Sequence, residues 1–184
     1  KKLQQLIGQV SEILYEDDEI FMENMRRKKN LPEEELQKYA HWEWTQGVGL
    51  YGIWKLFAAS GEKKYLEMLT RYYDRQRQGG FPQCNVNTAA PYLTLSYLAE
   101  YLQSETYLQP CREAAEWIMY EMPRTSEGGI QHMTSDDVNE QELWDDTLVM
   151  TVLFLANMGR ILDREDYRNE AQYQFLLHMK YLQD

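Results

Sequence analysis

The chain has 184 residues and a formal net charge of −11, with 43% hydrophobic and 13% aromatic residues. This length suits one core and one domain, and the composition excludes a disordered chain. The acidic balance argues against nucleic acid and anionic membranes as partners, because both need a basic surface. No apolar run reaches bilayer-spanning length. Residues 1–20 lack the apolar region of a signal peptide, which favours a cytoplasmic location, although the chain does not begin with Met.

Two kinds of predicted helix alternate along the chain. Amphipathic segments cover residues 1–28, 62–77, 106–121 and 165–182. Segments that are apolar on nearly all sides cover residues 47–59, 88–99 and 147–158. A helix without a polar face is buried on every side, so the apolar segments are predicted to be inner helices and the amphipathic ones outer helices. Pro91 lies near the first turn of its segment, where a missing N–H is tolerated.

Short polar joints link each inner segment to the outer segment that follows. Each joint leads to a tyrosine near the start of the outer helix, namely Tyr65, Tyr107 and Tyr167. This repeated helical hairpin predicts an all-α fold, an (α/α)6 toroid or barrel of which these residues supply about half, in roughly seven helices. We expect residues 1–184 to form one toroid domain that is incomplete at its C-terminus. An α-solenoid is the alternative, but its repeats usually leave one helix of each pair partly exposed.

Long loops precede the inner helices, at roughly 29–46, 78–87 and 122–146. Because the short joints make neighbouring helices antiparallel, the inner helices are parallel and the long loops gather at one end. These loops hold aromatic, amide and acidic side chains, a combination typical of a small-molecule site. The residues are Trp42 and Trp44 in the first loop, Asn85 and Asn87 in the second, and His132, Trp144 and Asp146 in the third.

Ordinary structural roles compete with these assignments. Asn87 or Thr88 could be an N-cap, and Asp145 or Asp146 could be a first-turn acid favoured by the helix dipole. The tryptophans could pack on helix starts, and Arg124 could cap the end of a helix. None of these roles needs a ligand.

A metal or cofactor is not expected. The histidines lie far apart in the sequence and outside any HExxH pattern, and Cys84 and Cys111 lack metal-binding spacing. "DDVNE" at 136–140 loosely resembles the magnesium motif of terpene cyclases. The glycines and small polar residues around it predict a loop, however, and no second metal-binding pattern follows.

Two motifs of the third loop together resemble a known group of enzymes. "PRTSEGGIQH" (123–132) followed by "QELWDDTLVM" (141–150) resembles the unsaturated glucuronyl and rhamnogalacturonyl hydrolases, glycoside hydrolase families 88 and 105, and family 105 more closely. "HWEWTQGVGLYG" (41–52) is similar to the aromatic start of that family. The resemblance runs from about residue 40 to the C-terminus. It departs at Asn85, where the family commonly has aspartate, and at Trp44, where tyrosine is more frequent.

The resemblance implies an incomplete (α/α)6 barrel that removes an unsaturated uronic acid from the non-reducing end of lyase-generated oligosaccharides. In the family, an aspartate protonates C4 of the C4=C5 double bond and water adds at C5. The Trp-x-Asp pattern assigns this role to Asp146 and not to Asp145. The predicted substrate contacts are Trp42, Trp44, Asn85, Asn87, His132, Trp144 and Met150.

Other functions and partners remain open at this point. The chain could be a toroid that binds oligosaccharide without catalysis, or another (α/α)6 carbohydrate enzyme such as a sugar epimerase. The expected partner is an unsaturated uronyl oligosaccharide. A half-toroid exposes one side of its inner helices, so the remaining half of the barrel or a second copy of the chain is also expected as a partner.

Overall fold

The computed structural model describes residues 2–183, apart from the side chains of residues 3, 4, 10, 11 and 13. Residues 1 and 184, which belong to the expected domain, lie outside this range. The helices are α1 (Lys2–Ile13), α2 (Glu19–Lys28), α3 (Glu33–Gln37), α4 (Trp44–Ser60), α5 (Lys63–Gly79), α6 (Val86–Leu102), α7 (Glu105–Tyr120), the π-helix η1 (Leu148–Val152), α8 (Leu153–Ile161) and α9 (Glu165–Leu182). None of the helices described is long and apolar enough to cross a membrane.

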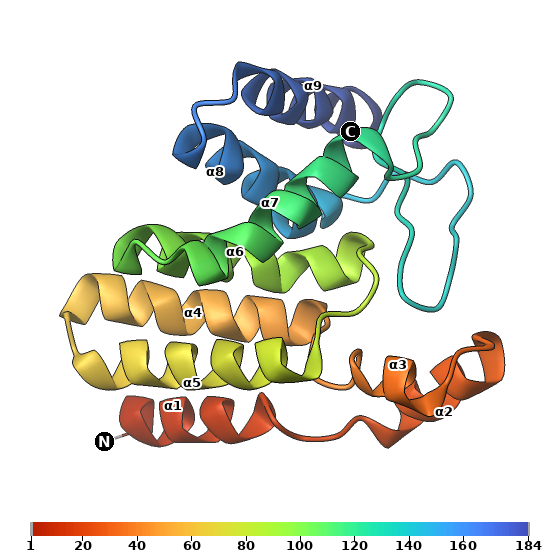
Figure 1. The fold of residues 1–184 in the computed structure, drawn as a ribbon. Helices are drawn as coiled ribbons and strands as arrows, with labels where there is room; N and C mark the ends of the chain where they lie inside the picture. Colours follow the sequence, from red (N-terminus) through yellow and green to blue (C-terminus); the bar gives the residue numbers. More distant parts are fainter. Residues whose placement is uncertain (1, 184) are drawn as a thin grey trace.

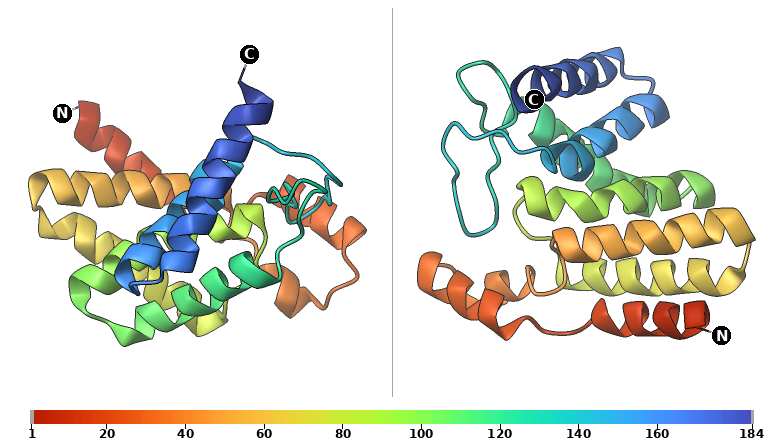
Figure 2. Two further views of the ribbon diagram at one scale, coloured as in Figure 1. Left: turned by 90° about the horizontal axis from the view of Figure 1, so that it is seen from above. Right: turned by 180° about the vertical axis from the view of Figure 1, so that it is seen from behind.

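The alternation of inner and outer helices is confirmed, and the arrangement is part of a helical toroid. In Figure 1 the inner helices α4, α6 and α8 all run in one direction, and the outer helices α5, α7 and α9 return in the other. The N-termini of the inner helices therefore share one end. The loop 122–146 lies at this end together with α2 and α3 (Figures 1 and 2).

The N-terminal part differs from the expected single outer segment over residues 1–28. It divides into α1 and α2, because Asp18 ends the intervening turn as an N-cap whose side chain accepts a hydrogen bond of 2.9 Å from the backbone N–H of Phe21. A further short helix, α3, follows Pro32 within the first long loop. Together with the division of the expected segment 147–158 into η1 and α8, these two features account for the helices beyond the roughly seven expected.

The helices α4 and α6 approach each other closely near their N-termini. A Cβ atom added to Gly47 would lie 2.6 Å from Ala90 Cβ and 2.9 Å from the backbone nitrogen of Pro91. Glycine is therefore required here for the backbones to meet. Pro91 itself lies in the second turn of α6, since the helix begins at Val86 and not near residue 88 as expected. The contact brings the N-terminal parts of both helices together.

The outer helices are linked by the tyrosines that mark the repeat. Tyr65, Tyr107 and Tyr167 are each the third residue of an outer helix, and all three are buried. The Tyr107 hydroxyl donates a hydrogen bond of 2.8 Å to Asp74 on α5, and the Tyr167 hydroxyl donates one to Glu116 on α7. The outer helices α7 and α9 are therefore each bonded to the outer helix before them.

Candidate active site

A pocket of about 430 Å³ opens at the end where the inner helices start. Its wall combines the N-termini of α4 and α6 with the third loop and η1. The residues that line it are Trp44, Val48, Asn87, His132, Thr134, Trp144, Asp146, Val149 and Met150. The structure thus brings together most of the predicted site residues, from three loops that are far apart in the sequence. None of these lining residues is a lysine or an arginine.

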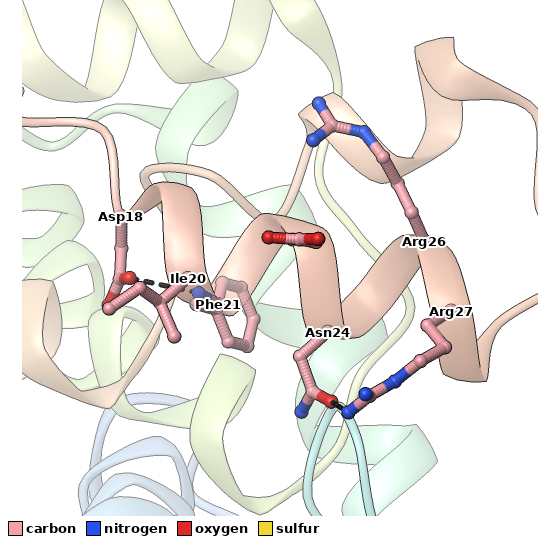
Figure 3. A pocket seen from close by; sticks show the side chains of 7 residues that line it. Asp18, Ile20, Phe21, Asn24, Arg26 and Arg27 are labelled. Carbon is pink, nitrogen blue, oxygen red and sulfur yellow. Dashed lines mark hydrogen bonds between the residues drawn. The ribbon is translucent and has the colours of Figure 1, made fainter.

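A larger hollow, of about 890 Å³, lies along α2 and is a weaker candidate (Figure 3). All of its lining residues fall between Asp18 and Arg27, so it has a wall on one side only. Its two arginines are already engaged, Arg26 with Glu33 at 2.7 Å and Arg27 with Asn24 at 2.8 Å. We therefore take the pocket between the inner helices as the candidate active site.

Asp146 lies on the pocket wall with its two carboxylate oxygens in different surroundings. Oδ1 is buried, lies 3.4 Å from His132 Nδ1 and has no hydrogen-bond partner among the described residues. The side chain as a whole is 40% exposed, so its accessible part faces the pocket. The backbone carbonyl of Asp146 accepts bonds from the N–H groups of Val149 and Met150, which fixes the residue at the start of the inner helix.

His132 and Trp144 form a stacked pair beside Asp146. Their ring centroids are 4.3 Å apart and the planes differ by 1°. Nδ1 of His132 also lies 2.8 Å from Thr147 Oγ1, and the indole N–H of Trp144 donates to Glu142 at 2.8 Å. Burial lowers the pKa of His132, while the nearby Asp146 and Glu142 oppose this shift. The imidazole is therefore neutral at neutral pH, and the half-exposed indole offers a flat apolar surface to a sugar ring.

The two neighbouring acids of "WDDT" separate in the structure. Asp145 is exposed and faces another hollow, of about 350 Å³, beside His178 and Met179 on α9. Of the two acids, only Asp146 lines the pocket between the inner helices. This divergence matches the preference for Asp146 that the Trp-x-Asp pattern gave.

The inner helix after Asp146 does not begin as a regular α-helix. Leu148–Val152 form a π-turn, in which the N–H of Leu153 donates to the carbonyl of Leu148, and α8 follows. Such turns are rare and occur often at functional sites. Here the wider turn directly follows Asp146, and both Val149 and Met150 line the same pocket. The expected continuous helix over 147–158 is thus divided.

Trp42 does not lie in the pocket, so its predicted role as a substrate contact is corrected. Its side chain is 0% exposed and packs against Phe81 and Tyr92 in the core. Its indole N–H donates a hydrogen bond of 2.9 Å to the carbonyl of Thr88 on α6. Trp42 therefore holds the first loop against the start of α6. The mixed polar and apolar pattern of "HWEW" does not reveal which of its tryptophans faces inward, but Trp44 lines the pocket as predicted.

Asn85 also has a structural position, in place of the predicted substrate contact. It is 4% exposed and is the N-cap of α6, since its side chain accepts a bond of 3.1 Å from the N–H of Thr88. Its Nδ2 group donates to Ser135 Oγ at 3.0 Å. The cap is therefore Asn85, and not Asn87 or Thr88, which leaves the side chain of Asn87 free to line the pocket.

Glu43 is the residue at the site that sequence reasoning missed. It directly precedes α4 and is only 7% exposed. Burial raises its pKa to about 7, although hydrogen bonds from Ser135 and Asn87 lower it, and nearby Asp136 raises it further. Its place between two tryptophans, immediately before an apolar helix, is the one signal in the sequence that indicated burial.

Two other polar residues of the third loop attach it to neighbouring helices. Arg124 donates to the carbonyls of Ile118 and Met119 and pairs with Glu170 at 3.3 Å, so it caps the end of α7. Asp136, in the segment compared with a magnesium motif, accepts a bond of 2.8 Å from Asn24. Lys28 lies 3.4 Å from the same carboxylate. Among the described residues, no group of acids, histidines or cysteines is arranged to hold a metal ion.

The comparisons with known proteins identify a family. The model of the family described as Glycosyl Hydrolase Family 88 matches residues 18–184. The "Unsaturated rhamnogalacturonyl hydrolase YesR" of Bacillus subtilis (strain 168) is 33% identical over 145 residues, which make up 78% of this chain and 42% of that protein.

Two solved structures are also similar, and both are described as possible members of family GH105. The protein from Klebsiella pneumoniae subsp. pneumoniae MGH 78578 is 41% identical, with a TM-score of 0.81 over 97% of this chain and 47% of its own. The protein from Salmonella enterica subsp. enterica serovar Paratyphi A str. ATCC 9150 is 38% identical, with a TM-score of 0.83 over 99% of this chain and 48% of its own. The chain spans less than half the length of these relatives. The match over residues 18–184 shows that the chain belongs to glycosyl hydrolase family 88.

Proposed function

We propose that the protein removes a C4=C5 unsaturated uronic acid from the non-reducing end of lyase-generated oligosaccharides by hydrating the double bond. The position of Asp146 supports this proposal most directly. Its carboxyl group lies on the wall of a pocket, beside the stacked pair of His132 and Trp144. Membership of the hydrolase family and the name of the relative YesR point to the same reaction class.

The reaction needs one acid that later accepts a proton. Protonated Asp146 donates its proton to C4, and positive charge develops at C5 next to the ring oxygen. Water then attacks C5 and gives a proton back to the Asp146 carboxylate. The product is a hemiketal, which opens and releases the neighbouring sugar. Because the substrate is a vinyl ether, the spacing rule for carboxylate pairs in ordinary glycosidases does not apply.

The rest of the pocket suits one sugar ring. Trp144 supplies a flat face, Met150 and Val149 supply apolar contact, and Asn87 supplies a polar group. The uronate carboxylate needs donors or a cation, and the described lining has no lysine or arginine. We therefore propose that the remaining half of the barrel, or a second copy of the chain, completes the site. A rhamnose-linked pectic fragment is the first substrate to test, given the name of YesR.

The test follows the ultraviolet absorbance of the C4=C5 double bond in pectic fragments, with the protein purified at its native length. We expect the absorbance to fall, and a reaction in heavy water to place deuterium at C4 of the released sugar acid. Binding measured by calorimetry without loss of absorbance would instead support an oligosaccharide-binding module. Cleavage or epimerisation that retains the double bond would support another carbohydrate enzyme.

A further inference from the structure

A buried contact beside Asp146 joins two polar side chains, and the reaction proposed above does not use it. His132 is 2% exposed and Thr147 is 0% exposed, and His132 Nδ1 lies 2.8 Å from Thr147 Oγ1. Thr147 directly follows Asp146 in the chain but does not line the pocket. A buried hydroxyl group is costly unless it is hydrogen-bonded, so this contact is the place where the Thr147 hydroxyl must find its partner.

The direction of this hydrogen bond follows from the partners of the two atoms. Among the described residues, His132 Nδ1 is the only hydrogen-bond partner of Thr147 Oγ1. A neutral imidazole carries a hydrogen on one ring nitrogen and a lone pair on the other. A hydrogen on Nδ1 would make Thr147 the acceptor and would leave its buried O–H without an acceptor, which is unfavourable. A lone pair on Nδ1 lets the Thr147 hydroxyl donate, and both groups are then satisfied.

Asp146 lies beside the same nitrogen but does not share the bond. Its Oδ1 atom is buried, lies 3.4 Å from His132 Nδ1 and has no hydrogen-bond partner among the described residues. A hydrogen on Nδ1 would reach this oxygen after a small movement of the Asp146 side chain, which is 40% exposed. Such a bond would favour the charged form of the carboxyl group. The proposed reaction needs the protonated form, because Asp146 donates to C4.

The charged groups near the His132 ring are few. Its titratable neighbours are Asp146 and Glu142, both on the third loop, and Glu142 accepts the indole N–H of Trp144 at 2.8 Å. The lining residues that come from α4, α6 and η1 are uncharged, namely Trp44, Val48, Asn87, Val149 and Met150. Burial lowers the pKa of His132, so the ring is neutral at neutral pH and one of its nitrogens lacks a hydrogen.

We propose that Thr147 is a positioning residue: by donating its hydroxyl hydrogen to Nδ1, it holds His132 in the tautomer with the hydrogen on Nε2 and so keeps Nδ1 from donating to Asp146. Oδ1 of Asp146 then receives no hydrogen bond from His132, and the carboxyl proton remains available for C4 of the substrate. This inference rests on the proposed function, because it concerns the acid of the same site.

The tautomer can be measured without the reaction. Nitrogen NMR of the native-length protein, prepared with isotope-labelled histidine, distinguishes a ring nitrogen that carries a hydrogen from one that does not. The spectrum of His132→Gln identifies the signals of His132. At about pH 8 we expect the hydrogen on Nε2 in the wild type and on Nδ1 in Thr147→Val, which keeps the shape of the side chain but lacks the hydroxyl. A hydrogen on Nδ1 in the wild type would overturn the proposal.

The consequence for Asp146 is measured in the pH dependence of the reaction. The variants are Thr147→Val, Thr147→Ser and the matched control Thr151→Val, which removes another buried hydroxyl one turn further along the same helix. In Thr147→Val, the limb on which kcat/KM falls with rising pH should move by about one unit to lower pH, because Nδ1–H now stabilises the Asp146 carboxylate. This lowers kcat/KM about tenfold above the limb and less than about twofold below it. Thr147→Ser keeps a hydroxyl and should retain the wild-type profile.

Three results of this assay would contradict the role of Thr147. The first is an unshifted limb in folded Thr147→Val, and the second is a loss of kcat/KM by the same factor at every pH. The third is an equal shift in Thr151→Val, which would indicate a general effect of losing a buried hydroxyl. If the wild type leaves the double bond intact, the proposed function fails, whereas the NMR measurement still decides whether Thr147 fixes the tautomer of His132.

Discussion

Replacing Glu43 by glutamine should remove a large part of the pH dependence of stability. The pKa of this side chain is raised from 4.5 in an ordinary environment to about 7 in the folded protein, chiefly by burial. A raised pKa means that the folded state holds the proton more tightly than the unfolded chain does. The raised pKa therefore contributes to the stability of the wild type in full below about pH 4.5, and this contribution is lost as the pH rises through about 7.

The size of the effect follows from the shift. Each unit of pKa corresponds to about 1.4 kcal/mol, so a shift of roughly 2.5 units corresponds to about 3 kcal/mol between acidic and alkaline pH. Glu43 is nearly fully buried, so solvent screening reduces this value little. Glutamine has a similar shape and does not titrate in this range. The difference in unfolding free energy, wild type minus Glu43→Gln, should thus fall by about 3 kcal/mol as the pH rises from acidic to alkaline values.

The assay is urea unfolding followed by tryptophan fluorescence, in steps from about pH 4 to pH 9, for the wild type, Glu43→Gln and the exposed control Glu140→Gln. Only the curve for Glu43→Gln should diverge from the wild type with pH. A difference that stays constant across the range would show that Glu43 does not titrate in the folded protein, and the reasoning from its burial would be wrong.

Three further predictions concern the parts of the chain that hold the site. Trp42→Phe should lower the unfolding free energy by about 1 to 2 kcal/mol, because it loses the bond to the Thr88 carbonyl, and should leave KM unchanged. A raised KM would indicate that Trp42 contacts the substrate after all. Gly47→Ala should cost about 2 kcal/mol in chemical unfolding, because its Cβ would meet the backbone of α6, and an unchanged midpoint would contradict that contact. Residues 1–184 expressed alone should self-associate in size-exclusion chromatography with light scattering, because the inner helices expose Trp44, Val48, Val149 and Leu153. A stable monomer with one cooperative melting transition would count against this last prediction.

The fold was largely predictable because a helix that is buried on all sides and a helix that is buried on one side have different patterns of apolar residues in the sequence. The inner segments are apolar on nearly all sides and the outer ones on one side only, and the repeated tyrosines mark where each outer helix begins. The break between α1 and α2 was harder to predict, because it depends on Asp18 acting as a cap and not on a change in the apolar pattern. The π-turn after Asp146 leaves no sequence pattern that we could use.

The candidate site was predicted less completely, for a related reason. Sequence reasoning located the loops that meet, but within each loop it could not tell which side chain turns inward. Trp42 and Trp44 are two residues apart, yet one is in the core and the other lines the pocket. Asn85 and Asn87 differ in the same way, as the helix cap and the pocket residue. Glu43 was missed because a single acid before a helix ordinarily indicates an exposed first turn.

The pair of variants Asp146→Asn and Asp145→Asn gives the most direct measurement of the proposed chemistry. Both remove one negative charge, and the two positions are adjacent, but only Asp146 lines the pocket beside His132. The rate of loss of double-bond absorbance should fall about 10³-fold in Asp146→Asn and change less than about threefold in Asp145→Asn. An inactive Asp145→Asn variant together with an active Asp146→Asn variant would contradict the assignment of Asp146 as the proton donor.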